Sequence, residues 1–192
     1  MTTVVAPPER RIPGEAGLWV FLFGDLVVFA VFFATFLHER GRAPELFHAA
    51  RRELVVGIGL TNTVVLLTGS WLVATGLRVL REGRTTLASR LFLAGAGAGV
   101  VFAGFKAVEY TRLGTEGHGP GTNHFFLYYV ILTAIHLVHV LLGTALLVVL
   151  SRQARRAELS PRRWALVEGG CCFWHLVDLL WIFLFPLLYL AS

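Results

Sequence analysis

The chain has 192 residues, of which 56% are hydrophobic and only 15% charged, with a formal net charge of +5. Soluble domains carry about 25% charged residues, so this is not an ordinary soluble composition, and its apolar content excludes a disordered chain. The two cysteines are adjacent, which excludes a disulfide scaffold. The arginines stand in short clusters between long apolar runs, which is typical of a membrane protein rather than of a nucleic-acid-binding one.

Five apolar stretches are each long enough to cross a bilayer, which takes about 20 residues in a helix. They must be helices, because an open sheet would leave unpaired backbone groups in lipid. We therefore predict an all-α, multi-pass membrane bundle with a short tail at residues 1–16 and one transmembrane domain at residues 17–190. The predicted spans are 17–37, 54–77, 91–110, 124–150 and 164–190.

The arginines predict the orientation of this bundle. The tail, the second loop and the fourth loop lie on one side and carry 11 arginines, whereas the first and third loops and the C-terminus carry 5. Because arginine is enriched on the cytoplasmic side, we expect the N-terminus inside and the C-terminus outside. The loop at 38–53 runs against this bias, since it holds four of the 5 arginines on the outer side.

Small residues form stripes in the second and third spans. In the second span Asn62, Gly69 and Gly76 are seven residues apart, and Thr61, Thr68 and Thr75 repeat this spacing one position earlier, so we expect both rows on one small, weakly polar helix face. The third span has Gly95, Gly99 and Ala103 at four-residue spacing. Such stripes allow close approach of helices in lipid, so we expect them to pack against other helices of this chain or of another subunit.

Ionisable residues inside the spans are informative, because burying them in lipid is costly and they tend to face protein. Asp25 lies ~12 Å into the first span and has no polar neighbour three or four residues away. It must be protonated or find a partner on another element, such as a histidine, tyrosine, asparagine, water or neighbouring subunit. Lys106 and Glu109 are three residues apart near the end of the third span and can pair on one helix face.

The last two spans carry the remaining candidates. His136 and His139 lie in the middle of the fourth span, and the fifth carries Glu168, His175 and Asp178. Glu168 and His175 share a helix face, which we expect to be turned to the bundle interior and met by one of the two histidines of the fourth span. The candidates for an intramembrane polar network or a proton route are Asp25, Asn62, Lys106, Glu109, His136, His139, Glu168, His175 and Asp178.

Three intramembrane histidines also raise the question of a metal or haem. His136 and His139 share one helix and cannot face each other across an iron, but one of them with His175 could. A histidine pair with carboxylates could also hold zinc or iron. Spacing of this kind is common in packed polar networks, so we expect no cofactor, no metal and no catalytic residue. Cys171 and Cys172 are expected to be inert packing residues.

Four motifs occur in order along the spans. Glu168 is followed by a Trp-His-Leu-Val-Asp-Leu-Leu-Trp run at 174–181, and the fourth span has His-Leu-Val-His-Val at 136–140 followed by Gly-Thr at 143–144. The third span ends in Glu-Tyr at 109–110, and the second has Asn-Thr at 62–63 followed by Gly-Ser at 69–70. With these motifs the chain resembles subunit III of the haem–copper oxidases over residues 17–190.

Some positions differ from the usual pattern of that family. Gly24-Asp25 stands where the oxidases usually have Ser-Glu, and Lys106 stands where they often have Gln. These residues, and Asn123 followed by Phe-Phe and Tyr-Tyr pairs at 125–126 and 128–129, are similar to the NorE-like branch associated with nitric oxide reductases. The five-helix count also suits that branch and some quinol oxidases.

The resemblance implies a cofactor-free accessory subunit in a bacterial plasma membrane. Its partners would be a catalytic haem-containing membrane subunit and membrane lipids, without nucleic acid, and it would support assembly, stability and, in the oxidases, proton uptake. Two alternatives remain: a membrane b-type cytochrome and a small proton-coupled transporter. The transporter is disfavoured because Pro186 is the only proline inside a span and no paired internal repeat is visible.

Overall fold

A computed structural model describes residues 16–156 and 160–190, and every regular element in them is helical. The long helices are separated by short loops, and one short helix and a terminal π-helical turn complete the described residues. The elements are α1 (Ala16–Arg42), α2 (Pro44–Arg51), α3 (Val56–Arg81), α4 (Thr85–Thr115), α5 (His124–Ala154), α6 (Pro161–Phe185) and η1 (Pro186–Leu190).

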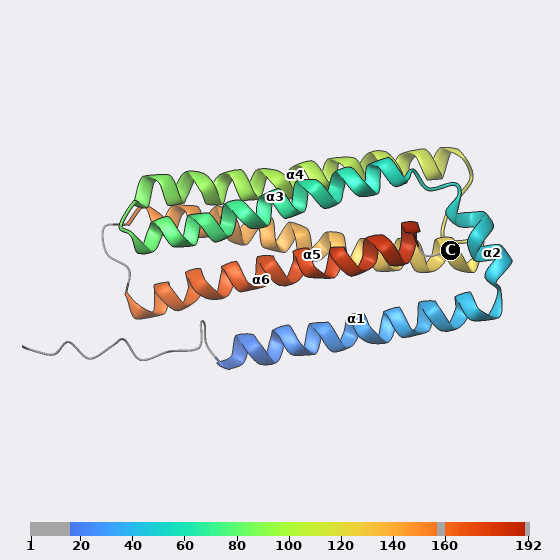
Figure 1. Cartoon of the computed structure of the whole chain (residues 1–192), viewed down its shortest axis with the longest axis horizontal. Coiled ribbons are helices and arrows are strands. Elements are labelled where there is room, and N and C mark those ends of the chain that lie inside the picture. Colours follow the sequence, from blue (N-terminus) through green and yellow to red (C-terminus); the bar gives the residue numbers. More distant parts are fainter. Residues whose placement is uncertain (1–15, 157–159, 191–192) are drawn as a thin grey trace, which may run out of the picture.

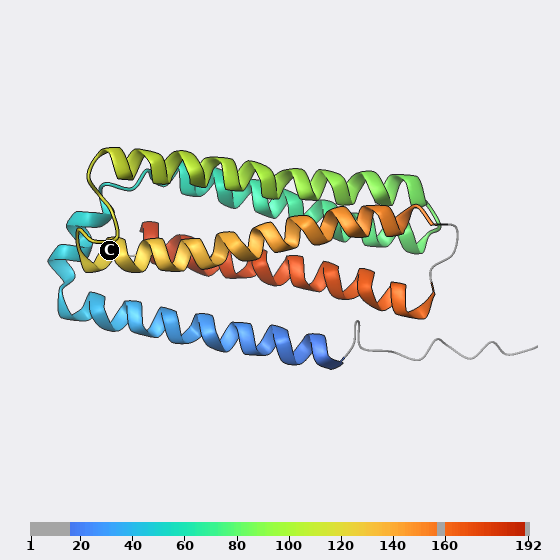
Figure 2. The same ribbon diagram turned by 180° about the vertical axis from the view of Figure 1, so that it is seen from behind.

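Helices α3, α4, α5 and α6 form an antiparallel bundle, and α1 lies along the side made by α5 and α6 (Figure 1, Figure 2). The short helix α2 crosses one end of the bundle, where the loop between α4 and α5 and the turn η1 also lie. We call this the α2 end. The loop between α3 and α4 and the start of α6 lie at the opposite end.

The five predicted spans are confirmed as five helices long and apolar enough to cross a membrane. Several run beyond the predicted limits: α1 continues to Arg42, and α4 begins at Thr85 and continues to Thr115. The loop expected at 38–53 instead contains the helix α2, which starts with a proline at its first position, where a missing N–H costs nothing. The spans were predicted from uninterrupted apolar residues, so each predicted span ends at the first charged residues. A helix can continue past charged residues until its backbone is capped.

Two glycines provide such caps. Gly83 and Gly117 are the described residues with positive φ, both at 80°, and each follows the last turn of a helix. The next amide closes the turn in both places: Arg84 N donates to the Val79 carbonyl at 2.9 Å, and His118 N to the Leu113 carbonyl at 2.8 Å. This left-handed glycine cap ends α3 and α4 independently of where the lipid ends.

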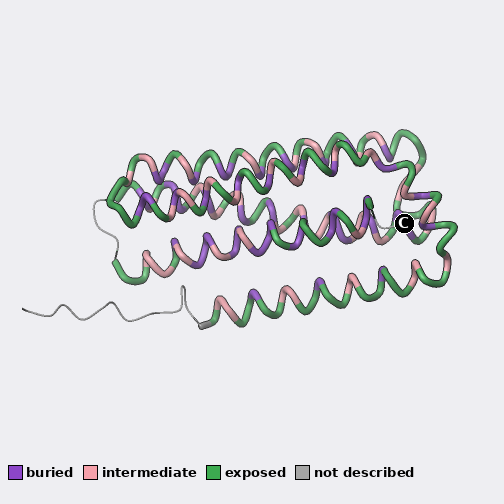
Figure 3. Tube along the Cα trace, in the orientation of Figure 1, coloured by how far each residue is buried: buried purple, intermediate pink, exposed green. Residues whose placement is uncertain are grey.

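The bundle buries α6 most and α1 least, as the colouring of Figure 3 shows. Trp174 and Trp181 of α6 are completely enclosed, whereas apolar residues such as Val20 and Val27 of α1 are exposed on the outer surface. This outward apolar surface is what lipid requires. α1 is therefore held by a narrow strip of contacts, and its other faces are open.

The small residues of α3 and α4 allow these two helices to pack closely. A Cβ added to Gly69 would lie 2.8 Å from the Cβ of Ala98, and one added to Gly95 would lie 2.8 Å from Val73. The packing prediction for this stripe is confirmed within the chain. The threonine row does not share it: Thr61 and Thr68 are exposed, and each hydroxyl donates to its own helix backbone at 2.8 Å. A step of one residue turns a helix by about 100°, which places the two rows on different faces.

Candidate functional site

The most enclosed polar group is an ion pair between Lys106 and Glu109 on α4. The Lys106 ammonium donates to Glu109 at 2.8 Å, and the two side chains are 0% and 3% exposed. The predicted pairing is confirmed, and it arises because residues three apart in a helix share a face. Inside an apolar bundle such a pair persists only if its remaining hydrogen-bonding capacity is also used.

Two tyrosines complete this pair. Besides Glu109, Lys106 Nζ donates to Tyr129 on α5 at 3.1 Å and to Tyr189 on η1 at 3.0 Å, so all three ammonium hydrogens are used. The Tyr189 hydroxyl donates to Glu109 at 2.8 Å and lies 3.2 Å from the Tyr129 hydroxyl. Lys106, Glu109, Tyr129 and Tyr189 form what we call the Lys106 cluster, which ties together α4, α5 and η1.

The surroundings of the cluster reinforce it. Lys106 Nζ lies 5.1 Å from the ring centre of Trp181 and 5.7 Å from that of Tyr110, within the range of cation–π attraction. Thr133 gives its hydroxyl hydrogen to the Tyr129 carbonyl at 2.6 Å, so the Tyr110 hydroxyl, 2.7 Å away, must donate to Thr133.

A hydrogen-bonding contact from the short helix α2 holds η1 beside the cluster. Arg51 of α2 donates to the carbonyls of Tyr189 and Leu190 at 3.3 and 3.0 Å. These are carbonyls at the end of a helical segment, which have no partner within the helix itself. Arg51 therefore fixes η1, and with it the Tyr189 hydroxyl that the cluster needs.

A second ionisable pair joins α1 to α5. Asp25 Oδ1 lies 3.1 Å from His139 Nε2, so the partner that the sequence required for Asp25 is a histidine. The other ring nitrogen, Nδ1, lies 2.8 Å from the Ile135 carbonyl, which can only accept, so Nδ1 carries a hydrogen. The single hydrogen between Nε2 and Oδ1 then belongs to either the histidine or the carboxyl. In both cases the pair is neutral overall and holds one shared proton.

The expected meeting of Glu168 and His175 with a histidine of α5 does not occur. Glu168, in the second turn of α6, accepts from Arg81, the last residue of α3, at 2.9 Å and is partly exposed. His175 Nδ1 lies 2.6 Å from the Ser70 hydroxyl on α3. The two residues share a helix face as predicted, but that face packs against α3 rather than α5. A helix in a bundle contacts helices that are distant in the sequence as well as the one before it.

The remaining candidates are buried without a complete set of partners. Asp178 lies close to Ser70, but its Oδ1 has no hydrogen-bond partner in the described residues. Asn62 and His136 are 0% exposed, and neither side chain makes a hydrogen bond within the same residues. Within the described part of the chain these groups thus stand apart from both ionisable pairs, and the nine candidates form several small clusters rather than one network.

Sequence reasoning missed the residues that complete these clusters. Tyr129, Tyr189, Ser70 and Arg81 each supply a partner from another helix. Tyr189 carries a usable signal, since a tyrosine and the proline at 186 interrupt the apolar end of the last span. Ser70 and Tyr129 stand in the motifs that carry the family resemblance, but their bonding partners and that of Arg81 had no signal, because contacts across helices depend on how each helix is rotated.

No group of three or more histidine, cysteine, aspartate or glutamate side chains could hold a metal ion within residues 16–156 and 160–190. For a bis-histidine haem, His175 would have to face one of the α5 histidines. His139 is bonded to Asp25, His175 to Ser70, and the His136 ring packs against Trp181. The three side chains are therefore directed to three different partners.

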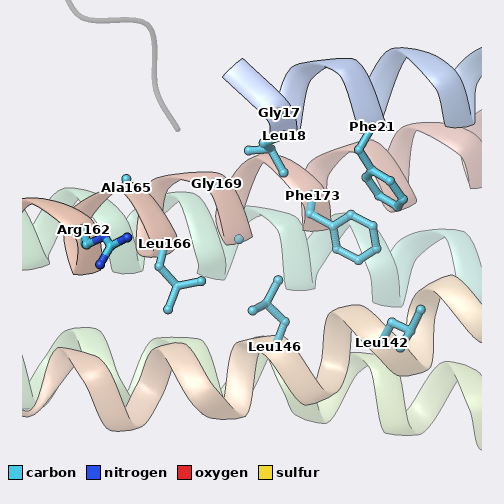
Figure 4. Close-up of a pocket in the computed structure, with 11 residues that line it drawn as sticks. Gly17, Leu18, Phe21, Leu142, Leu146, Arg162, Ala165, Leu166, Gly169 and Phe173 are labelled. Carbon is cyan, nitrogen blue, oxygen red and sulfur yellow. The ribbon is translucent and has the colours of Figure 1, made fainter. Parts of the chain in front are cut away.

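An apolar cavity of about 590 Å³ opens between α1, α5 and α6 (Figure 4). It lies toward the end opposite α2, where α1 diverges from the bundle. Among the described residues that line it, Arg162 at the start of α6 is the one that is charged. Its other walls are made by Gly17, Leu18, Phe21, Leu142, Leu146, Ala165, Leu166, Gly169, Gly170 and Phe173.

Five apolar helices around buried polar pairs define a multi-span helical membrane protein. Residues 13–192 match the family described as "Cytochrome c oxidase subunit III", and the chain belongs to this family.

Three relatives cover nearly the whole chain. Cytochrome c oxidase subunit 3 of Thermostichus vulcanus is 30% identical over 186 residues, which is 96% of this chain and 89% of that protein. Quinol oxidase subunit 3 of Bacillus spizizenii is 27% identical over 184 residues, covering 92% and 86%. Probable quinol oxidase subunit 3 of Staphylococcus aureus is 24% identical over 178 residues, covering 93% and 89%.

Proposed function

We propose that the chain is a cofactor-free accessory subunit of a respiratory haem–copper oxidase-superfamily complex in a bacterial plasma membrane. The observation that carries this is the family match over residues 13–192, together with relatives of similar length named as subunit 3 of oxidases. Its partner is a catalytic haem-containing membrane subunit, and its contribution is assembly and stability of that complex.

Co-purification from the native membrane tests this proposal. The tagged chain, extracted in mild detergent, is expected to bring with it a haem-containing membrane subunit identified by mass spectrometry. The chain purified alone is expected to show no Soret absorbance. A Soret band that stays with the isolated chain would instead identify a b-type cytochrome and overturn the proposal.

We further propose that the complex belongs to the nitric-oxide-reductase-associated branch. Two of the residues on which that assignment rests, Lys106 and Tyr129, are bonded to each other, and a third, Asn123, caps α5 by accepting from the Phe126 amide at 3.0 Å. Lys106 and Tyr129 therefore support each other physically. The co-purified complex is expected to consume nitric oxide, as measured with a nitric oxide electrode. Consumption of oxygen without consumption of nitric oxide would favour the oxidases.

We infer from the arginine bias that the α2 end faces outward and the N-terminus lies in the cytoplasm. Reporter fusions in the loops at 82–84 and 116–123 should report the cytoplasmic and the outer side, respectively. The reverse pattern would overturn this orientation. The cavity with Arg162 would then lie at the inner leaflet and be open to lipid acyl chains, which fits membrane lipids as additional partners.

We propose that the pair of Asp25 and His139 tunes proton access to the catalytic subunit. The pair shares one proton, it lies at the edge of the bundle, and Asp25 Oδ2 is buried without a partner in the described residues. α1, which carries Asp25, is the least buried span, so a neighbouring subunit could reach this edge.

The substitution Asp25→Asn tests this role, because it keeps the size and a hydrogen bond but removes titration. The assembled complex is expected to lose turnover or to decline during catalysis. Glu116→Gln, on the exposed Arg112–Glu116 pair at the α2 end, serves as the control and should leave turnover unchanged. Normal, sustained turnover of the Asp25→Asn complex across pH 6 to 9 would show that Asp25 is structural.

A further inference from the structure

His136 occupies the most enclosed position of the buried histidines. It lies in the middle of α5, is 0% exposed, and neither Nδ1 nor Nε2 has a hydrogen-bond partner in the described residues. Its ring is firmly placed: it stacks on Trp181 with centroids 5.2 Å apart and meets the edge of Phe102 at 5.5 Å. The packing fixes the ring and leaves both nitrogens without a protein partner.

A fully buried imidazole without partners is physically costly. In its neutral form it has one donor and one acceptor, and burying either unpaired costs more than an ordinary hydrogen bond contributes. A phenyl ring would make the same aromatic contacts without this cost. Buried polar groups that lack a protein partner are commonly satisfied by internal water, which makes about three hydrogen bonds.

The surroundings of His136 are polar in two directions. Its stacking partner Trp181 also has its ring centre 5.1 Å from Lys106 Nζ, so the same ring contacts both His136 and the Lys106 cluster. One helical turn away on α5 is His139, which holds Asp25. His136 therefore neighbours the Lys106 cluster through Trp181 and the pair of Asp25 and His139 along α5, and no hydrogen bond links these two groups in the described residues.

We propose that His136 is an internal water site, with water bound at its ring nitrogens between the Lys106 cluster and the pair of Asp25 and His139. This site is independent of the proposed function, since it depends only on the interior of the chain. It would supply the hydrogen bonds that the imidazole lacks and place an exchangeable molecule between two otherwise separate polar groups.

Nuclear magnetic resonance of the full chain in lipid nanodiscs, labelled with ¹⁵N at histidine, tests the site directly. The His136 signals are assigned by their loss in His136→Gln. At least one ring nitrogen of His136 is expected to show a through-space contact to water protons. The absence of any water contact at both nitrogens would overturn the proposal.

Thermal unfolding separates a hydrated site from a dry one. If water is bound, His136→Phe is expected to lower Tm by about 2–6 °C, because that water loses its partner, and His136→Gln should stay near wild type. If the site is dry, His136→Phe removes two unpaired polar atoms and should raise Tm, which would overturn the proposal. Val138→Phe, on the exposed face of α5, controls for phenylalanine on this helix.

Discussion

The Lys106 cluster and the pair of Asp25 and His139 use similar chemistry in different settings. Lys106 is 0% exposed and gives its three hydrogens to three oxygens on three elements. Asp25 has one bonded oxygen and one that is unpaired in the described residues, and it lies on the span with the smallest buried share. The first is complete within the chain, and the second is not.

This difference separates a structural role from a functional one. A buried ion pair with every hydrogen bond made resists any change of protonation, because each proton has a fixed place. A pair that shares one proton at the edge of a bundle can pass that proton on at less cost. The comparison therefore places the proposed proton role at the contact between α1 and α5 rather than in the Lys106 cluster, and variants of each group can test this proposal.

The largest effect is expected for Lys106→Met. It leaves Glu109 buried without its cation, which should lower the free energy of unfolding by about 3–5 kcal/mol. SDS titration in mixed micelles measures this loss. Adding Glu109→Gln should restore most of it, since the lone buried charge is removed, and Ala107→Met on the exposed side of α4 should have little effect. A loss below about 1 kcal/mol for Lys106→Met would contradict a closed cluster.

Tyr189→Phe should have the next largest effect. It removes the hydroxyl that donates to Glu109 and accepts from Lys106, leaving both buried groups with one bond fewer. We expect a loss of about 1–3 kcal/mol in the same titration. Tyr128→Phe is the matched control, because Tyr128 is only partly buried; equal losses in the two variants would indicate that the buried Tyr189 hydroxyl contributes no more than a partly buried one.

The sequence was sufficient for the contacts made within one helix. The spacing of Lys106 and Glu109 fixes their pairing whatever the rest of the bundle does. The five spans likewise follow from apolar length alone. Even for Asp25, a mid-span carboxyl with no neighbour on its own helix required a partner elsewhere, and a histidine was among the expected ones.

The sequence was not sufficient for contacts between helices. In a span that is apolar on every face, hydropathy does not reveal which face points inward, so the rotation of α6 toward α3 was not predictable. The bonds of Glu168 to Arg81 and of His175 to Ser70 depend on that rotation. The Lys106 cluster also needs η1, whose position depends on the contact of Arg51 with the last carbonyls.

Arg81→Gln tests the ion pair at the end opposite α2, which differs from the Lys106 pair in exposure. The Arg81 side chain is 56% exposed and that of Glu168 is 26% exposed, so water screens their attraction. We expect a loss of about 0.5–1 kcal/mol, and less for the exposed Arg78→Gln. A loss comparable to that of Lys106→Met would mean that Glu168 is part of a buried network after all.

The smallest effect on stability is expected for Asp25→Asn, even though its effect on turnover is expected to be large. His139 Nδ1 gives its hydrogen to the Ile135 carbonyl, so a neutral His139 presents Nε2 as an acceptor toward residue 25. A protonated aspartate and an asparagine amide can both donate to it. An asparagine at residue 25 can therefore keep Nε2 paired.

Replacing that donor with an amide should then change the free energy of unfolding by less than about 0.5 kcal/mol, whereas Asp25→Leu, which leaves Nε2 unpaired, should cost about 1–3 kcal/mol. Both values come from the same SDS titration. A loss of about 1.5 kcal/mol or more for Asp25→Asn would show a charge-assisted bond, and hence an ion pair of imidazolium and carboxylate. Asp25 and His139 would then be an ion pair like Lys106 and Glu109. The two pairs would differ only in that the pair of Asp25 and His139 lies at the edge of the bundle.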